Sequence, residues 1–264
     1  MAATVVARVR SHPIPRMYND RLSVRAMVRA VTQSLAALET SIAEDASLRA
    51  IRAEIERRAR EAADGDAAHD LGHLLRVALW TMRLGEADGV DPRLAIAAAL
   101  LHDVVNVPKS SPDRTRASAM CAEVARELLP RHGFTPDEVE LVSGAVLDHS
   151  YSRGATPRTP LGCALQDADR LEALGAIGLM RCISTGSRMS SRYFDDADPF
   201  AEARPLDDVR YSIDHFYTKL LGLPATMRTE AGRREAERRA AFLRAFLSEL
   251  AHELGRPQGS LGSR

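Results

Sequence analysis

The sequence predicts an all-α protein. No stretch shows the sustained polar and apolar alternation of a half-buried strand, and no Asn-Gly turn joins two β-branched runs. Helix starts are clearly marked, because a capping side chain followed by proline recurs along the chain. These pairs are Asp91-Pro92, Ser111-Pro112, Thr135-Pro136 and Thr159-Pro160.

The expected helices follow from these starts and from apolar residues at helical spacing. Three helices precede the first marked start, and four more begin at the marked starts. Thr135 is followed by Glu138 at the spacing of a capping box, which strengthens the start at Pro136. Two further helices complete the C-terminal part. The sequence predicts helices over 21–44, 48–63, 69–86, 92–106, 113–131, 136–150, 160–178, 207–222 and 229–254.

Three segments lack a helical pattern. Residues 1–20 are rich in arginine and poor in acids, which is also typical of targeting peptides, but a flexible leader is the favoured interpretation. Residues 182–206 are rich in Gly, Ser, Asp and Pro and predict a long loop near the functional site. Residues 255–264 predict a disordered tail. The intervening residues 21–254 are expected to form a single helical domain.

Composition excludes several classes of partner. The chain has 264 residues, with 36 Lys and Arg against 36 Asp and Glu, so nothing favours a nucleic-acid polymer or an anionic membrane. No apolar run is long enough to cross a bilayer. The 3 cysteines are widely spaced, as expected for reduced thiols of a cytoplasmic protein. A homo-oligomer is left open.

The stretch ALLHDVVN, residues 99–106, breaks the most apolar helix of the chain with two polar residues. His102 and Asp103 stand among Leu, Ala and Val side chains. Burying an imidazole and a carboxylate there is costly unless they have a common partner. His73 raises the same question, because it shares an apolar helix face with Val77 and Trp80.

Helical spacing turns two more polar side chains inward. Asp169 shares a face with Leu165 and Ala173, and His149 shares one with Val142 and Val146. One divalent cation would satisfy several of these inward-facing groups at once. Mixed imidazole and carboxylate ligands favour Mn, Fe, Co, Ni or Zn, and Mg is also considered. The set proposed to share that cation is His73, His102, Asp103 and Asp169.

Three motifs carry a family resemblance. HDLGHLLRV, AALLHD and LQDADRLEALGAIG together resemble the HD-domain superfamily of metal-dependent phosphohydrolases, and most closely its small, stand-alone bacterial hydrolases. DHSYS and the C-terminal stretch from Tyr211 resemble the same branch. The resemblance implies a helical HD-domain bundle with additional N- and C-terminal helices. Its core would span about 64–180 and its C-terminal helices about 207–254.

The resemblance also implies a reaction. Its H…HD…D pattern matches His73, His102 with Asp103, and Asp169, which would hold the metal. Asp103 would thereby also belong to the catalytic groups. A metal-bound water would attack phosphorus in a phosphomonoester or pyrophosphate bond. The substrate would be a nucleotide or another small phosphorylated metabolite.

One position departs from the family pattern. Many HD nucleotide hydrolases carry an acid three residues after the doublet, where this chain has Asn106. A general base must then come from elsewhere, with Asp70 and Asp167 as candidates, unless metal-bound hydroxide suffices. Proton-transfer assistance is typically worth about 10²–10⁴-fold.

Other residues are expected around the substrate. Lys109 follows the doublet in a loop that leads to a helix start, which favours phosphate binding. Arg76, one turn beyond His73, is expected to reach a phosphate or to extend to solvent. His149 and Asn106 are expected to face the substrate, and His69 to orient a metal ligand from behind.

Two alternatives stay open at this point. Some HD-fold proteins hold two irons and act as oxygenases, for which His132 and His149 are the available additional ligands. The other alternative is a degenerate HD module used for binding or regulation, against which the intact set of four ligands argues.

Overall fold

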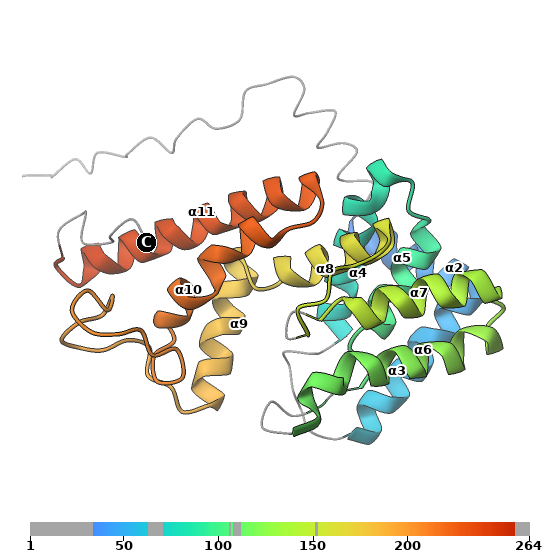
Figure 1. Ribbon diagram of the computed structural model, residues 1–264, viewed down its shortest axis with the longest axis horizontal. Helices are drawn as coiled ribbons and strands as arrows, with labels where there is room; N and C mark the ends of the chain where they lie inside the picture. The colour runs from blue at the N-terminus through green and yellow to red at the C-terminus, as the bar shows by residue number, and fades with distance from the viewer. Residues whose placement is uncertain (1–33, 63–70, 106, 108–111, 151–152, 257–264) are drawn as a thin grey trace, which may run out of the picture.

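Helices account for the regular structure of a computed structural model of the chain, which describes residues 34–62, 71–105, 107, 112–150 and 153–256 (Figure 1). Within those ranges the only strand-like feature is an isolated bridge between Arg192 and Tyr211. The all-α expectation is confirmed. The helices are α2 (Leu35–Glu44), α3 (Ala46–Ala62), α4 (Leu71–Gly85), α5 (Pro92–Leu101), α6 (Ala117–Arg131), α7 (Pro136–Asp148), α8 (Pro160–Leu171), α9 (Gly175–Arg188), α10 (Asp214–Thr218) and α11 (Glu230–Glu253), with short 3₁₀ turns η2 (Glu86–Asp88), η3 (Pro112–Arg116) and η5 (Leu220–Thr226).

The cap-and-proline signals start helices as expected. The side chains of Asp91 and Thr159 accept hydrogen bonds from backbone N–H groups in the first turns of α5 and α8. Thr135 and Glu138 form the complete capping box at the start of α7. Ser111, the leader over 1–20 and most of the expected tail lie outside the described residues.

The core is built around α5. Every residue of α5 from Leu94 to Leu101 is buried, as its almost continuous apolar sequence requires. It packs against α3, α4, α6, α7 and α8, while α4 also lies along α8 and α6 along α7. Because α5 has neighbours on all sides, the residues that follow Leu101 emerge inside the bundle. The C-terminal helices α9, α10 and α11 lie together to one side in Figure 1. Of these, α11 packs against α8, α9 and η5.

The prediction of one helix over 160–178 is wrong, because this stretch contains α8 and the start of α9. α8 ends at Leu171, and Leu174 is extended before Gly175, which has φ +69°. A left-handed residue reverses the chain direction at little cost only when it is glycine. The side chain of Arg239 from α11 covers that glycine. Sequence spacing alone did not reveal the break, because the apolar pattern continues through it.

Two neighbouring expectations also need correction. The predicted loop over 182–206 begins later, because α9 continues to Arg188. The single helix predicted over 207–222 does not form; turns lead into the short α10, and η5 begins at Leu220 and continues past 222 to Thr226. The reason is Asp214, whose buried carboxylate accepts hydrogen bonds from Arg204 and from the backbone N–H of Asp207. These tertiary bonds hold residues 204–213 in a compact turn.

We expect Gly178→Ala to lower the free energy of unfolding by about 2–3 kcal/mol. A Cβ at Gly178 would overlap the backbone carbonyl group of Ala173, which cannot move aside as a flexible side chain can. Urea denaturation measures the loss. Gly222→Ala is the matched control, because a Cβ there meets no atom within 4 Å. Equal losses in the two variants would contradict the packing argument.

Candidate metal centre

Four helices bring their ends or inner faces together around one cluster. His73 belongs to the first turn of α4 and Asp169 to the last turn of α8. His102 is the C-terminal cap of α5, and Asp103 follows it directly. His149 is the C-terminal cap of α7. The three histidines are buried and the two aspartates are about a quarter exposed.

The distances fit ligand atoms arranged around a single centre. Nε2 of His73 lies 3.8 Å from Oδ2 of Asp103 and 3.7 Å from Oδ1 of Asp169. Nε2 of His102 lies 3.7 Å and 3.9 Å from the same two oxygens. These separations are too long for hydrogen bonds. They suit atoms that each contact a cation between them.

Two overlapping groups of side chains could each hold an ion. One consists of His73, His102 and Asp169, and the other of His102, Asp103 and His149. In each group the ligand atoms all lie within 4.8 Å of one another. His102 is common to both groups. The structure thus brings together the four residues proposed from the sequence and adds His149 beside them.

Backbone hydrogen bonds orient two of the histidine rings. Nδ1 of His102 lies 2.7 Å from the carbonyl oxygen of Ala99, and Nδ1 of His149 lies 2.6 Å from that of Val146. A carbonyl oxygen only accepts, so each Nδ1 carries the proton and each Nε2 presents a lone pair to the cluster. Nε2 of His102 is fully buried and has no hydrogen-bond partner among the described residues. A cation would supply the partner that this atom lacks.

Electrostatics favour a positive charge at this point. Burial lowers the pKa of His102 to about 4, so its imidazole is neutral at neutral pH. Burial would also lower the pKa of His149, but the neighbouring carboxylate of Asp103 outweighs it and raises that pKa. The two aspartates therefore attract a proton to His149, as they would attract a metal ion.

A buried acid behind His73 was missed by the sequence analysis. Glu172 is only 2% exposed, and its Oε2 lies 3.3 Å from Nδ1 of His73. Oε2 also accepts from Nε of Arg76 at 2.9 Å, and Arg181 of α9 lies 3.5 Å away. Burial raises the pKa of Glu172, but hydrogen bonds from His73 and Arg76 outweigh it and lower that pKa to about 2. Its spacing of three residues from Asp169 places both on one helix face, which was the available signal.

The other proposed residues fall into two sets. The carboxylate of Asp167 is fully buried away from the cluster and accepts hydrogen bonds from the backbone N–H groups of Arg228 and Thr229. Burial raises its pKa against the effect of those bonds. Arg76 is half-buried and paired with Glu172. The proposed residues that lie outside the described part of the chain are His69, Asp70, Asn106 and Lys109.

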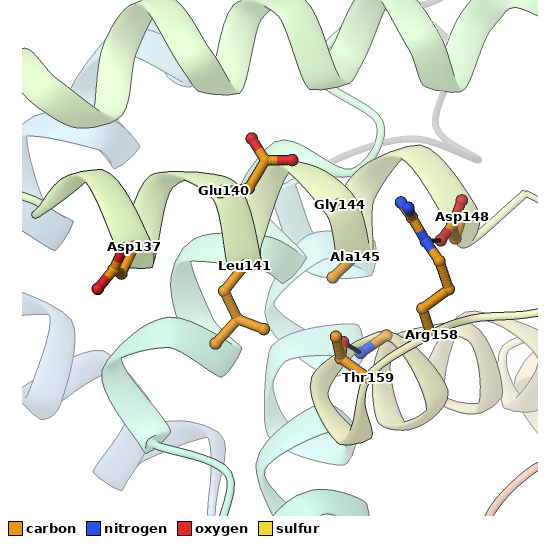
Figure 2. Close-up of a pocket in the computed structure, with 9 residues that line it drawn as sticks. Asp137, Glu140, Leu141, Gly144, Ala145, Asp148, Arg158 and Thr159 are labelled. Carbon is orange, nitrogen blue, oxygen red and sulfur yellow. Dashed lines mark hydrogen bonds and ion pairs between the residues drawn. The ribbon is translucent and has the colours of Figure 1, made fainter.

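A separate cavity of about 380 Å³ lies between α7 and the start of α8 (Figure 2). Leu141, Gly144 and Ala145 of α7 form part of its lining. Arg158 donates to Asp148 across the cavity at 3.0 Å, which ties down the end of α7 just before His149. None of the cluster residues lines this cavity.

Comparisons with known proteins show the family and the fold. The family described as HD domain matches residues 70–174. The uncharacterized protein YpgQ of Bacillus subtilis is 32% identical over 196 residues, which cover 72% of this chain and 87% of YpgQ. In the described part of the chain, no helix has the length and apolar character needed to span a membrane.

Solved structures share the fold. The crystal structure of YpgQ in complex with ADP matches with a TM-score of 0.59 and 25% identity, covering 78% of this chain and 93% of that one. An HD-superfamily hydrolase of Bacillus thuringiensis matches with a TM-score of 0.60 and 27% identity, covering 79% and 97%. A protein of Lactobacillus plantarum matches with a TM-score of 0.61 and 28% identity, covering 80% and 98%.

Proposed function

Because the chain belongs to the HD-domain superfamily, we propose that it is a metal-dependent phosphohydrolase that acts on a nucleotide or another small phosphorylated metabolite. The observation that carries the proposal is the buried Nε2 of His102, which faces His73, Asp103 and Asp169 and has no hydrogen-bond partner among the described residues. Similarity to an HD-superfamily hydrolase supports the reaction class.

The residues of the cluster fit a divalent cation. His73, His102, Asp103 and Asp169 would hold it, with two nitrogen and two oxygen donors. This donor set suits Mn, Co, Ni, Fe or Zn, and Mg remains a candidate. When bound, such an ion lowers the pKa of a coordinated water and offsets negative charge that develops on phosphoryl oxygens. The helices contribute preorganisation, because they hold the donor atoms close together before the substrate binds.

The proposed substrate is a small phosphorylated molecule. YpgQ has been crystallised in complex with ADP, which supports a nucleotide for this chain too. Arg76 and Arg181 lie behind His73, where both form ion pairs with Glu172. Guanidinium groups pair well with phosphate oxygens. Hydrolysis of a phosphate ester needs such cations, because they stabilise the negative charge that develops on the phosphoryl oxygens.

We propose Asp70 rather than Asp167 as the general base. The carboxylate of Asp167 already accepts hydrogen bonds from Thr229 and from a second backbone N–H at the start of α11. Those bonds give it a structural task. Asp70 stands three residues before His73 in the sequence and is the remaining candidate for accepting the proton of the attacking water.

One observation supports the oxygenase alternative and one argues against it. His149 does join His102 and Asp103 in a second candidate metal group. His132, however, is the C-terminal cap of α6 and belongs to neither candidate group among the described residues. Oxygen consumption by protein loaded with ferrous iron tests this alternative.

A phosphate-release screen tests the proposed function. Metal-stripped protein is supplied in turn with Mn²⁺, Co²⁺, Ni²⁺ and Mg²⁺ and with a panel of nucleotides and phosphorylated metabolites. We expect phosphate or pyrophosphate release with at least one nucleotide and at least one metal. A protein that binds metal but releases nothing from the whole panel would favour the binding-module alternative.

We expect chelation to lower thermal stability. A ligand present at 100 times its Kd stabilises the folded state by about 2.7 kcal/mol, and this contribution disappears when the ion is removed. The melting temperature with and without chelator measures the effect. The His102→Ala variant is the control, because a chelator should shift its melting temperature little. An unchanged wild-type melting temperature would contradict a buried metal centre.

We expect Lys109→Ala to lower kcat/KM by roughly 10- to 150-fold, which is the loss of one charge-assisted contact of about 1.5–3 kcal/mol. The proposed role of Lys109, in the loop after the HD doublet, is to bind a phosphoryl oxygen of the substrate. Metal content and melting temperature should stay as in wild type. Lys219→Ala is the control, because Lys219 is the chain's other lysine and lies beside α10. Wild-type kinetics in Lys109→Ala would contradict the proposed role and indicate that Lys109 is a solvated lysine that does not contact the substrate.

A further inference from the structure

Among the described residues, Nδ1 of His73 has two close polar neighbours of opposite kind, one on Glu172 and one on Arg181. Oε2 of Glu172 lies 3.3 Å from it, and a terminal nitrogen of Arg181 lies 2.8 Å from it. A carboxylate only accepts hydrogen bonds, whereas a guanidinium only donates them. The two neighbours therefore favour different positions for the ring proton of His73.

The position of that proton decides whether His73 can bind a metal through Nε2. With the proton on Nδ1, the ring donates to Glu172 and its Nε2 lone pair faces Asp103 and Asp169. With the proton on Nε2, Nδ1 accepts from Arg181 and the ring offers no lone pair to the cluster. Glu172 stabilises the ligand form, and Arg181 stabilises the other.

We propose that Glu172 is a positioning residue that holds His73 in its metal-binding tautomer against the competing donor Arg181. The proposal rests on the metal centre assigned above and gives His73 a different anchor from those of the other two histidines. His102 and His149 are oriented by backbone carbonyls of their own helices, at Ala99 and Val146. His73 lies in the first turn of α4 and depends instead on the side chain of Glu172, the C-terminal cap of α8.

The surroundings of Glu172 explain how one carboxylate can do this. It is the C-terminal cap of α8 and is buried against α4 and α9. Nε of Arg76 donates to its Oε2 at 2.9 Å, and a terminal nitrogen of the same guanidinium lies 2.8 Å from that oxygen. This ion pair helps to hold the carboxylate in place. Arg181 can also turn from His73 to the same carboxylate, 3.5 Å away, when a metal requires the proton on Nδ1.

Metal affinity in matched variants tests the proposal. Calorimetric titration of metal-stripped protein with Mn²⁺ compares wild type with Glu172→Gln, Arg181→Ala and Glu235→Gln. We expect Glu172→Gln to bind Mn²⁺ about 10- to 100-fold more weakly, as is typical when the partner of a ligating histidine is changed. Arg181→Ala should bind as tightly as wild type or more tightly. Glu235 also bridges two arginines, Arg238 and Arg239, so its variant should bind like wild type.

If Glu172 and Arg181 had only a structural role around His73, both variants should lose affinity for Mn²⁺. The proposal instead expects a loss in Glu172→Gln and no loss in Arg181→Ala. Wild-type affinity in Glu172→Gln, or an equal loss in Arg181→Ala, would overturn the proposal. Melting temperatures of the metal-free proteins show whether each variant folds. Glu172→Asp keeps the charge with a shorter side chain, and we expect it to retain more affinity than the Gln variant.

Nitrogen NMR of the histidine rings gives a readout without metal. In metal-free wild type we expect His73 to carry its proton on Nδ1, and in Glu172→Gln we expect a shift toward Nε2. A wild-type His73 protonated on Nε2 would overturn the proposal even if no variant folds. Failure of wild type to bind Mn²⁺ with the expected tautomer present would instead reject the metal centre itself.

Discussion

Replacing His102 with alanine should lower metal affinity by more than about 100-fold and remove metal-dependent phosphate release. His102 is fully buried and is the one residue shared by both candidate metal groups. Changing the partner of a ligating histidine typically costs about 10- to 100-fold in affinity, so removal of the ligand itself should cost more. Metal content after dialysis, measured beside phosphate release, gives the result.

His132→Ala is the control for that variant. His132 caps α6 and belongs to neither candidate group. It should keep wild-type metal content and activity. Because removal of a buried ring also leaves a cavity, Asp169→Asn offers an independent change at a partly exposed ligand. Full metal retention in both His102→Ala and Asp169→Asn would refute the assigned ligands.

Replacing Asp167 with alanine should lower the free energy of unfolding by roughly 3–5 kcal/mol. The change leaves two backbone N–H groups and the hydroxyl of Thr229 without their acceptor, and each unsatisfied buried donor costs about 1–3 kcal/mol. These donors start α11, which packs against α8 and α9. Urea denaturation measures the loss.

The same variant separates a structural role from a catalytic one. If Asp167 only holds α11, the folded fraction of Asp167→Ala should keep the wild-type kcat. Asp208→Ala is the control for stability, because Asp208 is an exposed acid whose bonds go to His215 and Thr218. A stable Asp167→Ala protein with kcat lowered about 10²-fold or more would restore Asp167 as the general base.

The sequence predicted the features that depend on local chemistry. Cap residues before proline located the starts of α5, α7 and α8, because those hydrogen bonds form within one helical turn. The interruption of an apolar helix at His102 and Asp103 indicated the candidate centre, since α5 is buried from Leu94 to Leu101 and packs among other helices. His73 and Asp169 followed from their inward helix faces.

The missed features depend on contacts between distant segments. The chain reverses at Gly175, whose conformation is fixed together with the packing of Arg239 from α11. Arg181 reaches His73 only because α9 starts anew after that reversal. Glu172 is buried between His73 and two arginines that come from other helices. Apart from the spacing of Glu172 from Asp169, no sequence pattern reveals these contacts.

The most direct test of the account is a titration of metal-stripped protein with Mn²⁺ while phosphate release from a nucleotide substrate is followed. We expect no release in the presence of chelator, and release that rises with bound metal and saturates when the centre of His73, His102, Asp103 and Asp169 is filled. Undiminished phosphate release from protein that holds no metal would contradict the account.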